Sequence, residues 1–314
     1  MKITTLMGGP LDCTVAFQLK LTMIFISGQN AAMRALPALL ACSLVLPGCA
    51  RSTAHQAGRV EVVAGVYPLA YVAERIGGAH VHVTDLTPAG AEPHDIELSP
   101  AQVGEVQQAG LVLLVHGLQA ALDAAARGNV LDAAQVGAPP APGLAKDPHV
   151  WQDPVRMSAI ATEVAGRMAA RDTAHASDYT AGAAALVADL RRLDADIRAA
   201  LGHCARHDIV TSHEAFGHFA ARYGLHQVGI AGISPDADPS PRRLADIAAY
   251  VRTHDVTTVF TESLVSPRVA ETVAREAHVR TAVLDPIEGV RPGDDYFTVM
   301  RRNVAALRVA LGCT

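Results

Sequence analysis

The chain has 314 residues, of which half are hydrophobic and few are aromatic, and its formal net charge is −5. This length suits two compact lobes better than one small core, and the composition is that of a globular protein. The negative charge argues against a nucleic-acid partner, and no stretch after residue 50 is long and apolar enough to span a bilayer.

The N-terminal region carries the features of a bacterial secretion signal. Arg34 precedes a short apolar run, and small residues lead from that run to Cys49. The segment Leu46–Cys49 resembles a lipobox, the site where a signal is cut and the new N-terminal cysteine is acylated. We therefore expect Cys49 to carry lipid. An ordinary signal peptide that is cut elsewhere is the alternative.

These features divide the start of the chain into three expected parts. We expect residues 1–48 to be a leader, in which residues 1–32 are an extension upstream of the natural start and residues 33–48 are the lipoprotein signal peptide. Residues 49–59 are polar or small and should form a lipid-anchored tether.

Strands and helices are expected to alternate from residue 60 onward. The hydrophobic patterns predict strands and helices in turn, and Gly77-Gly78 is a natural helix end. The expected elements are a strand at 60–66, a helix at 69–76, a strand at 81–86, a helix at 100–108, a strand at 111–115 and a Pro/Gly/Ala-rich loop at 137–148. Such alternation predicts an α/β lobe with a mostly parallel sheet flanked by helices.

One long helix is expected to bridge two lobes. Apolar residues recur every three or four positions from Tyr179 to Ile197, which predicts a single amphipathic helix of about 40 Å. We expect this bridging helix at 174–202, between an N-terminal lobe at 60–173 and a C-terminal α/β lobe at 203–314.

The second lobe should repeat the architecture of the first. The expected elements are strands at 209–211, 227–230, 257–261 and 281–284, a proline-rich loop at 234–241 and a helix at 244–252.

Two cysteines remain once the leader has gone and Cys49 has been acylated. Cys204 and Cys313 are then an even pair in an oxidising compartment. We predict a disulfide that ties the last residues of the chain to the start of the second lobe. Two separate buried thiols are the alternative.

Polar residues with metal-binding side chains follow the expected strands. His213 and Asp285 come just after strands, and His94 follows another strand. His149 follows the Pro/Gly/Ala-rich loop at 137–148. In parallel α/β sheets the carboxyl ends of strands line the ligand crevice, so these side chains can face a shared cleft between the lobes. Three imidazoles and one carboxylate suit a closed zinc tetrahedron, which favours holding the metal over catalysis.

These residues do not form a motif on their own. The chain has 14 histidines, and neither an H-E-x-x-H nor a CxxC motif occurs. Each of the three histidines taken alone is more often structural, and Asp285 alone would pass for a turn residue. Glu262, which follows a strand, is either a carboxylate that orients a ligand or a structural hydrogen-bond partner.

Several segments, in order, resemble one family of metal receptors. The chain is similar to the metal-binding lipoproteins of ABC importers, which include high-affinity zinc-uptake proteins, manganese receptors and adhesin lipoproteins. The similar segments are Tyr67–Leu69 with Ile76–Gly78, Gly90–Asp95, Asp147–Trp151 with Asp153-Pro154, Thr211–His213 with Ala215–Gly217, Phe260–Ser263 and Leu284–Pro286.

The resemblance implies a receptor and not an enzyme. It implies Zn²⁺ as the bound substrate, an ABC permease as the partner, and a monomer that is lipid-anchored outside the cytoplasmic membrane or in the periplasm, with no nucleic-acid partner. By this resemblance the metal ligands are His94, His149, His213 and Asp285, with Glu262 and Glu92 as candidates for supporting them. Manganese-type members usually carry glutamate at the position of His213, and nitrogen here favours zinc.

Three other functions stay open at this point. The same receptor could carry Mn²⁺ or Fe²⁺. A zinc-dependent hydrolase would need an open coordination position and a general base such as Glu262 or Glu214. An adhesin or a purely structural lipoprotein would keep its role without the four ligands.

Overall fold

The computed structural model describes residues 58–88, 90–235 and 238–314. The predicted leader, the acylated Cys49 and most of the tether lie outside the described residues. Among the helices that the structure describes, we find none with both the length and the apolar character of a membrane span.

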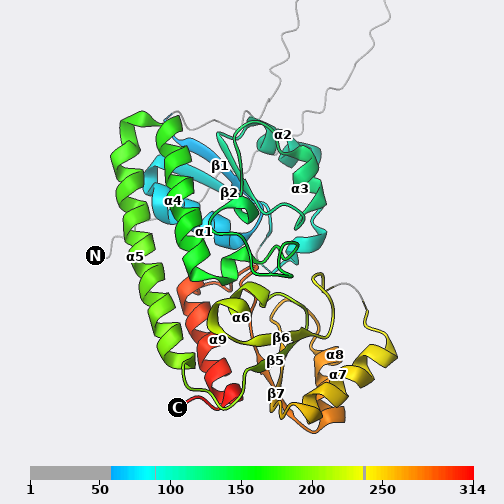
Figure 1. Ribbon diagram of the computed structural model, residues 1–314. Helices are drawn as coiled ribbons and strands as arrows, with labels where there is room; N and C mark the ends of the chain where they lie inside the picture. Colours follow the sequence, from blue (N-terminus) through cyan, green and yellow to red (C-terminus); the bar gives the residue numbers. More distant parts are fainter. Residues whose placement is uncertain (1–57, 89, 236–237) are drawn as a thin grey trace, which may run out of the picture. The chain divides into compact units, whose positions relative to one another are not determined.

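The first lobe is built on a parallel sheet of four strands in the described residues, with the order β2-β1-β3-β4 (Figure 1). The strands are β1 (Val60–Ala64), β2 (Val81–Asp85), β3 (Leu111–Leu114) and β4 (Val130–Asp132). The helices are α1 (Tyr67–Gly77), α2 (Pro100–Gln108), α3 (Ala120–Ala125) and α4 (Pro154–Arg171). Because β1 and β3 are almost entirely buried, they read as the hydrophobic runs from which they were predicted.

The second lobe repeats this arrangement, again with a parallel sheet, in the order β6-β5-β7-β8. The strands are β5 (Asp208–Thr211), β6 (His226–Gly229), β7 (Thr258–Thr261) and β8 (Arg280–Val283). The helices are α6 (Gly217–Tyr223), α7 (Pro241–Thr253), α8 (Arg268–Ala277) and α9 (Tyr296–Leu311). Short 3₁₀ helices complete the fold at Gly78–His80 (η1), Pro93–Asp95 (η2), Ala133–Gln135 (η3), Val150–Gln152 (η4) and Thr173–His175 (η5).

The long helix α5 (Ala176–Leu201) has 26 residues and packs against both lobes. Figure 1 shows it in green beside α4, running from the first lobe to α9 of the second. Its contacts include α1 and α4 on one side and α6 and α9 on the other. The buried residues of α5 are Leu201 and the six that the periodicity predicts: Tyr179, Ala183, Leu186, Leu190, Leu193 and Ile197. Two parallel α/β lobes joined by a long helix confirm the predicted fold class.

The start of α4 also fixes a carboxylate near the site. Asp153 is the N-cap residue of this helix, and its Oδ1 accepts hydrogen bonds from the backbone N–H groups of Val155 and Arg156. Pro154 occupies the first position, where its missing N–H leaves no bond unmade.

A disulfide joins Cys204 to Cys313, which are 109 positions apart in the sequence. The same two residues form an antiparallel bridge, so the last residues of the chain pair with the segment that leads from α5 into β5. The disulfide prediction is confirmed.

Candidate metal centre

His213 lies two residues beyond the end of β5 and is fully buried. Its backbone N–H donates to Glu262 Oε1 at 3.0 Å, and its Nδ1 lies 2.6 Å from Glu262 Oε2. Glu262 directly follows β7, the neighbour of β5 in the sheet. The adjacent carboxyl ends of two parallel strands therefore place the imidazole beside the Glu262 carboxylate, which matches one of the two roles that the sequence left open for Glu262.

His149 is held in the same way by a carboxylate two residues before it. This fully buried residue precedes η4, and Asp147 Oδ1 accepts from its backbone N–H at 2.9 Å and faces its Nδ1 at 2.7 Å. Because an ionised carboxylate can only accept, the Nδ1 atoms of His149 and His213 carry protons. The Nε2 atoms are left for another partner.

His94 lies in η2, and its side chain is largely buried. Glu92 Oε1 accepts a long hydrogen bond of 3.4 Å from its backbone N–H and lies 3.9 Å from its Nε2. Glu92 thus lies beside His94, where a supporting residue was expected.

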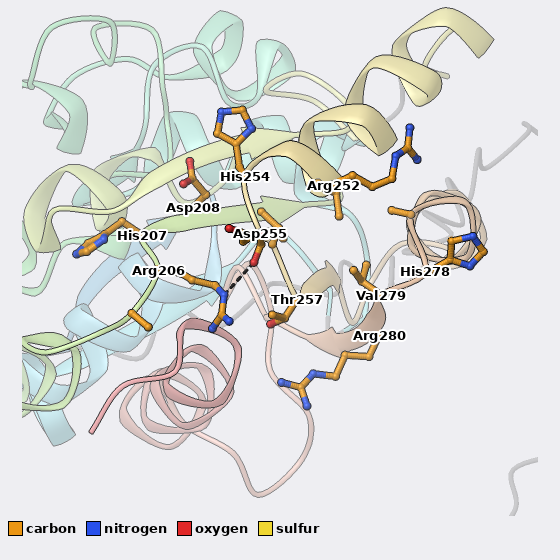
Figure 2. A pocket seen from close by; sticks show the side chains of 14 residues that line it. Arg206, His207, Asp208, Arg252, His254, Asp255, Thr257, His278, Val279 and Arg280 are labelled. Atoms are coloured by element: carbon orange, nitrogen blue, oxygen red, sulfur yellow. Dashed lines mark hydrogen bonds between the residues drawn. The ribbon is translucent and has the colours of Figure 1, made fainter.

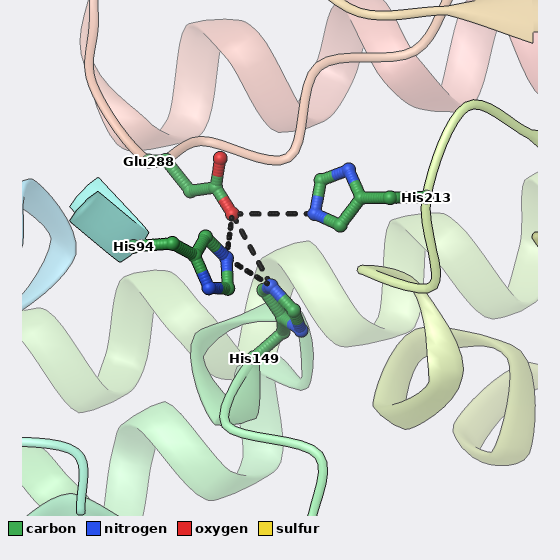
Figure 3. A group of neighbouring side chains, drawn as sticks. All are labelled: His94, His149, His213 and Glu288. Carbon is green, nitrogen blue, oxygen red and sulfur yellow. Dashed lines mark hydrogen bonds and ion pairs between the residues drawn. The ribbon is translucent and has the colours of Figure 1, made fainter. Parts of the chain in front are cut away.

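The fourth member of the group is Glu288 (Figure 3). Its Oε1 lies 3.2 Å from Nε2 of His149 and 3.5 Å from Nε2 of both His94 and His213. The four candidate ligand atoms lie within 4.8 Å of one another. Two of the side chains come from the first lobe and two from the second.

Asp285 is not in this group, so the prediction of Asp285 as the fourth ligand disagrees with the structure. Its Oδ2 accepts from Ser263 Oγ at 2.5 Å, and its Oδ1 accepts from the backbone N–H of Ile287 at 2.8 Å. Ile287 has a φ of 61°, in the left-handed region. Asp285 therefore stabilises the tight turn after β8 that directs Glu288 to the three histidines. The sequence pointed to Glu288 only in that it is a second acid in the loop that carries Asp285.

The centre contains buried polar atoms that lack hydrogen bonds. Among the described residues, His213 Nε2 and both carboxylate oxygens of Glu288 make no hydrogen bond of acceptable geometry. Their mutual distances are those of ion pairs. His94 Nε2 also lies only 3.3 Å from His149 Nε2. Buried polar groups are rarely left in this state, and a cation among three imidazoles and a carboxylate would satisfy them all.

The charges of the group shift its proton equilibria in a consistent direction. Burial lowers the pKa of His213, but the hydrogen bond with Glu262 and the nearby Glu288 carboxylate outweigh burial and raise it from 6.5 to about 10. The pKa of His149 is also raised, because Asp147 and Glu288 outweigh burial. Burial raises the pKa of Glu288, but the three histidines outweigh it and hold the pKa well below 4.5. Without metal the group therefore retains protons that a metal ion must displace.

A depression of about 980 Å³ lies at the opposite, amino-terminal edge of the second sheet (Figure 2). Its arginines bond to backbone carbonyls: Arg206 Nε donates to Asp255 O at 2.8 Å and Arg280 Nη2 to Val309 O at 3.4 Å. The labelled histidines and arginines point in different directions and do not share a centre. This depression is therefore a weaker candidate than the His/Glu group.

Comparison with known proteins identifies the family of the chain. The family described as "ZnuA: Zinc-uptake complex component A periplasmic" matches residues 62–310 of the chain. The chain belongs to this family. The zinc-binding protein AdcA of Streptococcus pyogenes serotype M3 is 33% identical over 288 residues, which cover 80% of this chain and 56% of that relative. The chain thus spans little more than half the length of this curated relative of the zinc-uptake component A family.

Two solved structures of similar proteins share the fold. The Zn(II)-bound ZnuA-like domain of Streptococcus pneumoniae AdcA matches with a TM-score of 0.69 and 30% identity, over 81% of this chain and 99% of that domain. The laminin-binding protein Lmb of Streptococcus agalactiae, described as a bifunctional protein with adhesin and metal transporting activity, matches with a TM-score of 0.75 and 28% identity, over 81% of this chain and 99% of that protein.

Proposed function

We propose that this protein is a receptor that captures Zn²⁺ outside the cytoplasm and delivers it to an ABC-type importer. The observation that carries the proposal is the buried group of three histidines and Glu288, in which polar atoms converge without hydrogen-bond partners. The matching family is described as a component of a zinc-uptake complex, and the relative is named a zinc-binding protein. Both descriptions support transport over catalysis.

His94, His149, His213 and Glu288 are the proposed ligands. Three nitrogens and one oxygen match the ligand set of a four-coordinate zinc site, whereas Mn²⁺ favours sites richer in oxygen. Four protein ligands fill a tetrahedron, so the site offers no position for an activated water, and a hydrolase is disfavoured.

The proposed mechanism of zinc capture depends on the fact that the ligands come from both lobes. Because His94 and His149 belong to one lobe and His213 and Glu288 to the other, a bound ion links the lobes and favours the arrangement in which all four ligands reach it. Asp147 and Glu262 keep the two Nδ1 atoms occupied, so Nε2 faces the ion.

The setting of this receptor follows from the sequence. We propose that Cys49 anchors a monomeric receptor at the outer face of the membrane, or at a membrane that faces the periplasm, and that the loaded form docks on the permease. A single acyl chain gives only marginal attachment, so stable anchoring requires more than one.

Calorimetric titration of the metal-stripped protein tests the metal assignment. We expect one tight zinc site that excess Mn²⁺ does not displace, and a loss of more than about 100-fold in affinity for His213→Ala, since supporting residues alone account for about 10–100-fold. Exposed His116, replaced by alanine, is the matched control. Tight Mn²⁺ binding that competes with zinc would assign the receptor to manganese instead.

A further inference from the structure

Helix α6 of the second lobe packs against the first-lobe segment Asp147–Asp153, which carries His149. The helix begins four residues after His213. Three of its residues, Gly217, His218 and Arg222, contact Asp147 or Asp153. We call these three residues and their two aspartate partners the α6 bracket. The bracket links the segments of two proposed ligands without using either ligand.

The strongest contact of the bracket is the ion pair between Arg222 and Asp153. Arg222 Nε lies 2.9 and 3.0 Å from the two oxygens of Asp153, and Nη2 lies 2.5 Å from Oδ2. Asp153 is only 6% exposed and is also the N-cap of α4. A guanidinium that contacts both carboxylate oxygens fixes orientation as well as distance, which a lysine cannot do.

The other end of the bracket touches the residue that orients His149. His218 is buried, and its Nε2–H donates to the backbone carbonyl of Asp147 at 3.0 Å. Gly217 lies so close that a Cβ there would be 2.5 Å from Asp147 Oδ2 and 2.8 Å from Leu144 Cδ2. A side chain at position 217 would force Asp147 or Leu144 to shift, so Asp147 packs against α6 as well as against its own loop.

A separate contact keeps the lobes together when the bracket is weakened. Trp151 Nε1 donates to the carbonyl of Pro286 at 2.8 Å, and Gln152 Nε2 donates to the same oxygen. Tyr296 OH donates to Trp151 O at 2.7 Å. Because these bonds do not involve Arg222, a variant at that position should still fold.

We propose that Arg222 is a positioning residue for zinc, which sets the separation of His149 and His213 through its pairing with Asp153. This inference rests on the proposed zinc site. Without the ion pair, α6 and the Asp147–Asp153 segment are held by fewer contacts, and the separation of His149 and His213 becomes less well defined. Zinc affinity should fall by about 10–100-fold, the range for residues that support metal ligands. The ratio of zinc affinity to Mn²⁺ affinity should also decrease.

The test compares Arg222→Gln, Arg222→Lys and Asp153→Asn with the intact protein. Asparagine keeps the N-cap of α4 and removes only the charge. Arg192→Gln is the matched control, because Arg192 is a 70% exposed arginine on α5 that pairs with Asp189. The measurements are zinc affinity by competition with a chromophoric chelator, the visible absorption of the Co²⁺-loaded protein, and circular dichroism of the metal-free form.

The expected result is a loss of about 10–100-fold in zinc affinity for Arg222→Gln and Asp153→Asn, with a smaller loss for Arg222→Lys and none for Arg192→Gln. The Co²⁺ absorption bands should change in Arg222→Gln and Asp153→Asn. The circular dichroism of the metal-free form should stay the same in both variants. Zinc affinity within twofold of the intact protein in Arg222→Gln would overturn the inference.

Three further outcomes bear on this inference. If Arg222→Gln unfolds, Arg222→Lys takes its place, and unchanged affinity and Co²⁺ bands in that variant would overturn the inference. An equal loss in Arg192→Gln would show an effect of overall charge and would overturn it too. If the intact protein fails to bind zinc, the proposed function fails and not the positioning role alone.

Discussion

At the scale of single residues, the site depends on which nitrogen of each histidine is free. Asp147 and Glu262 occupy Nδ1 of His149 and His213, so only Nε2 can face an ion. Glu288 supplies a negative charge close to all three Nε2 atoms. The same carboxylate attracts protons to the imidazoles when no metal is present, which makes zinc and protons competitors for the same atoms.

This competition predicts that zinc binding releases protons near neutral pH. The pKa of His213 is raised from 6.5 to about 10. In the metal-free form at pH 7.5 its imidazole is therefore positively charged, with a proton on both ring nitrogens. Apparent zinc affinity should therefore rise as pH increases from 6.5 toward 10. Titration calorimetry in two buffers with different ionisation enthalpies measures the protons released. Identical heats in both buffers at pH 7.5 would contradict this account.

The same pKa shifts define the pH window of stability in the metal-free form. The contribution of His213, whose pKa is raised, is fully present below pH 6.5 and is lost as pH rises toward 10. The contribution of Glu288, whose pKa is lowered, is present above pH 4.5 and is lost as pH falls. Urea unfolding without metal should therefore show lower stability at pH 9.5 than at pH 6.5.

Three of the four proposed ligand positions were predictable and one was not. His94, His149 and His213 stand out because imidazoles follow strand ends or a conspicuous loop. At the fourth position two acids, Asp285 and Glu288, lie in one loop, and the sequence favours the acid nearer the strand. The left-handed turn at Ile287 decides which acid faces the histidines, and an isoleucine in that conformation has no sequence signature.

At the scale of elements, the long helix and most of the strands were predictable, but some short elements were not. The helix α5 follows from a spacing kept from Tyr179 to Ile197, and the buried strands follow from hydrophobic runs. The strand β4 has three residues and α6 has seven, too few for a period to appear. The sequence analysis therefore did not predict α6, the helix whose contacts with Asp147 and Asp153 support the segment that carries His149.

The disulfide is the element-scale feature with the clearest energetic consequence. Because it closes a loop of 109 positions, its reduction should lower the free energy of unfolding by about 2–5 kcal/mol. Urea unfolding of the Cys204→Ser/Cys313→Ser variant against the oxidised protein measures this change. Zinc affinity of the folded variant should stay within about twofold, since neither cysteine belongs to the metal group. Unchanged stability would contradict the prediction.

At the scale of the whole molecule, the proposed ion joins parts of the chain that are far apart in sequence. The proposed ligands come together only in the folded protein, so we expect zinc binding and folding to be coupled. Free zinc at 100 times the dissociation constant should stabilise the protein by about 2.7 kcal/mol. Thermal unfolding with and without zinc measures this shift, and Glu288→Gln should largely lose it. An equal shift in that variant would place the metal elsewhere.

The most direct test of the account compares the two acids of the loop after β8. Zinc affinity is measured for Glu288→Gln and Asp285→Asn, both of which keep side-chain size and remove one charge. We predict a loss of more than about 100-fold for Glu288→Gln, beyond the effect of a supporting residue, and a loss within about 10-fold for Asp285→Asn. The reverse order, with zinc binding intact in Glu288→Gln and abolished in Asp285→Asn, would contradict the proposed metal centre.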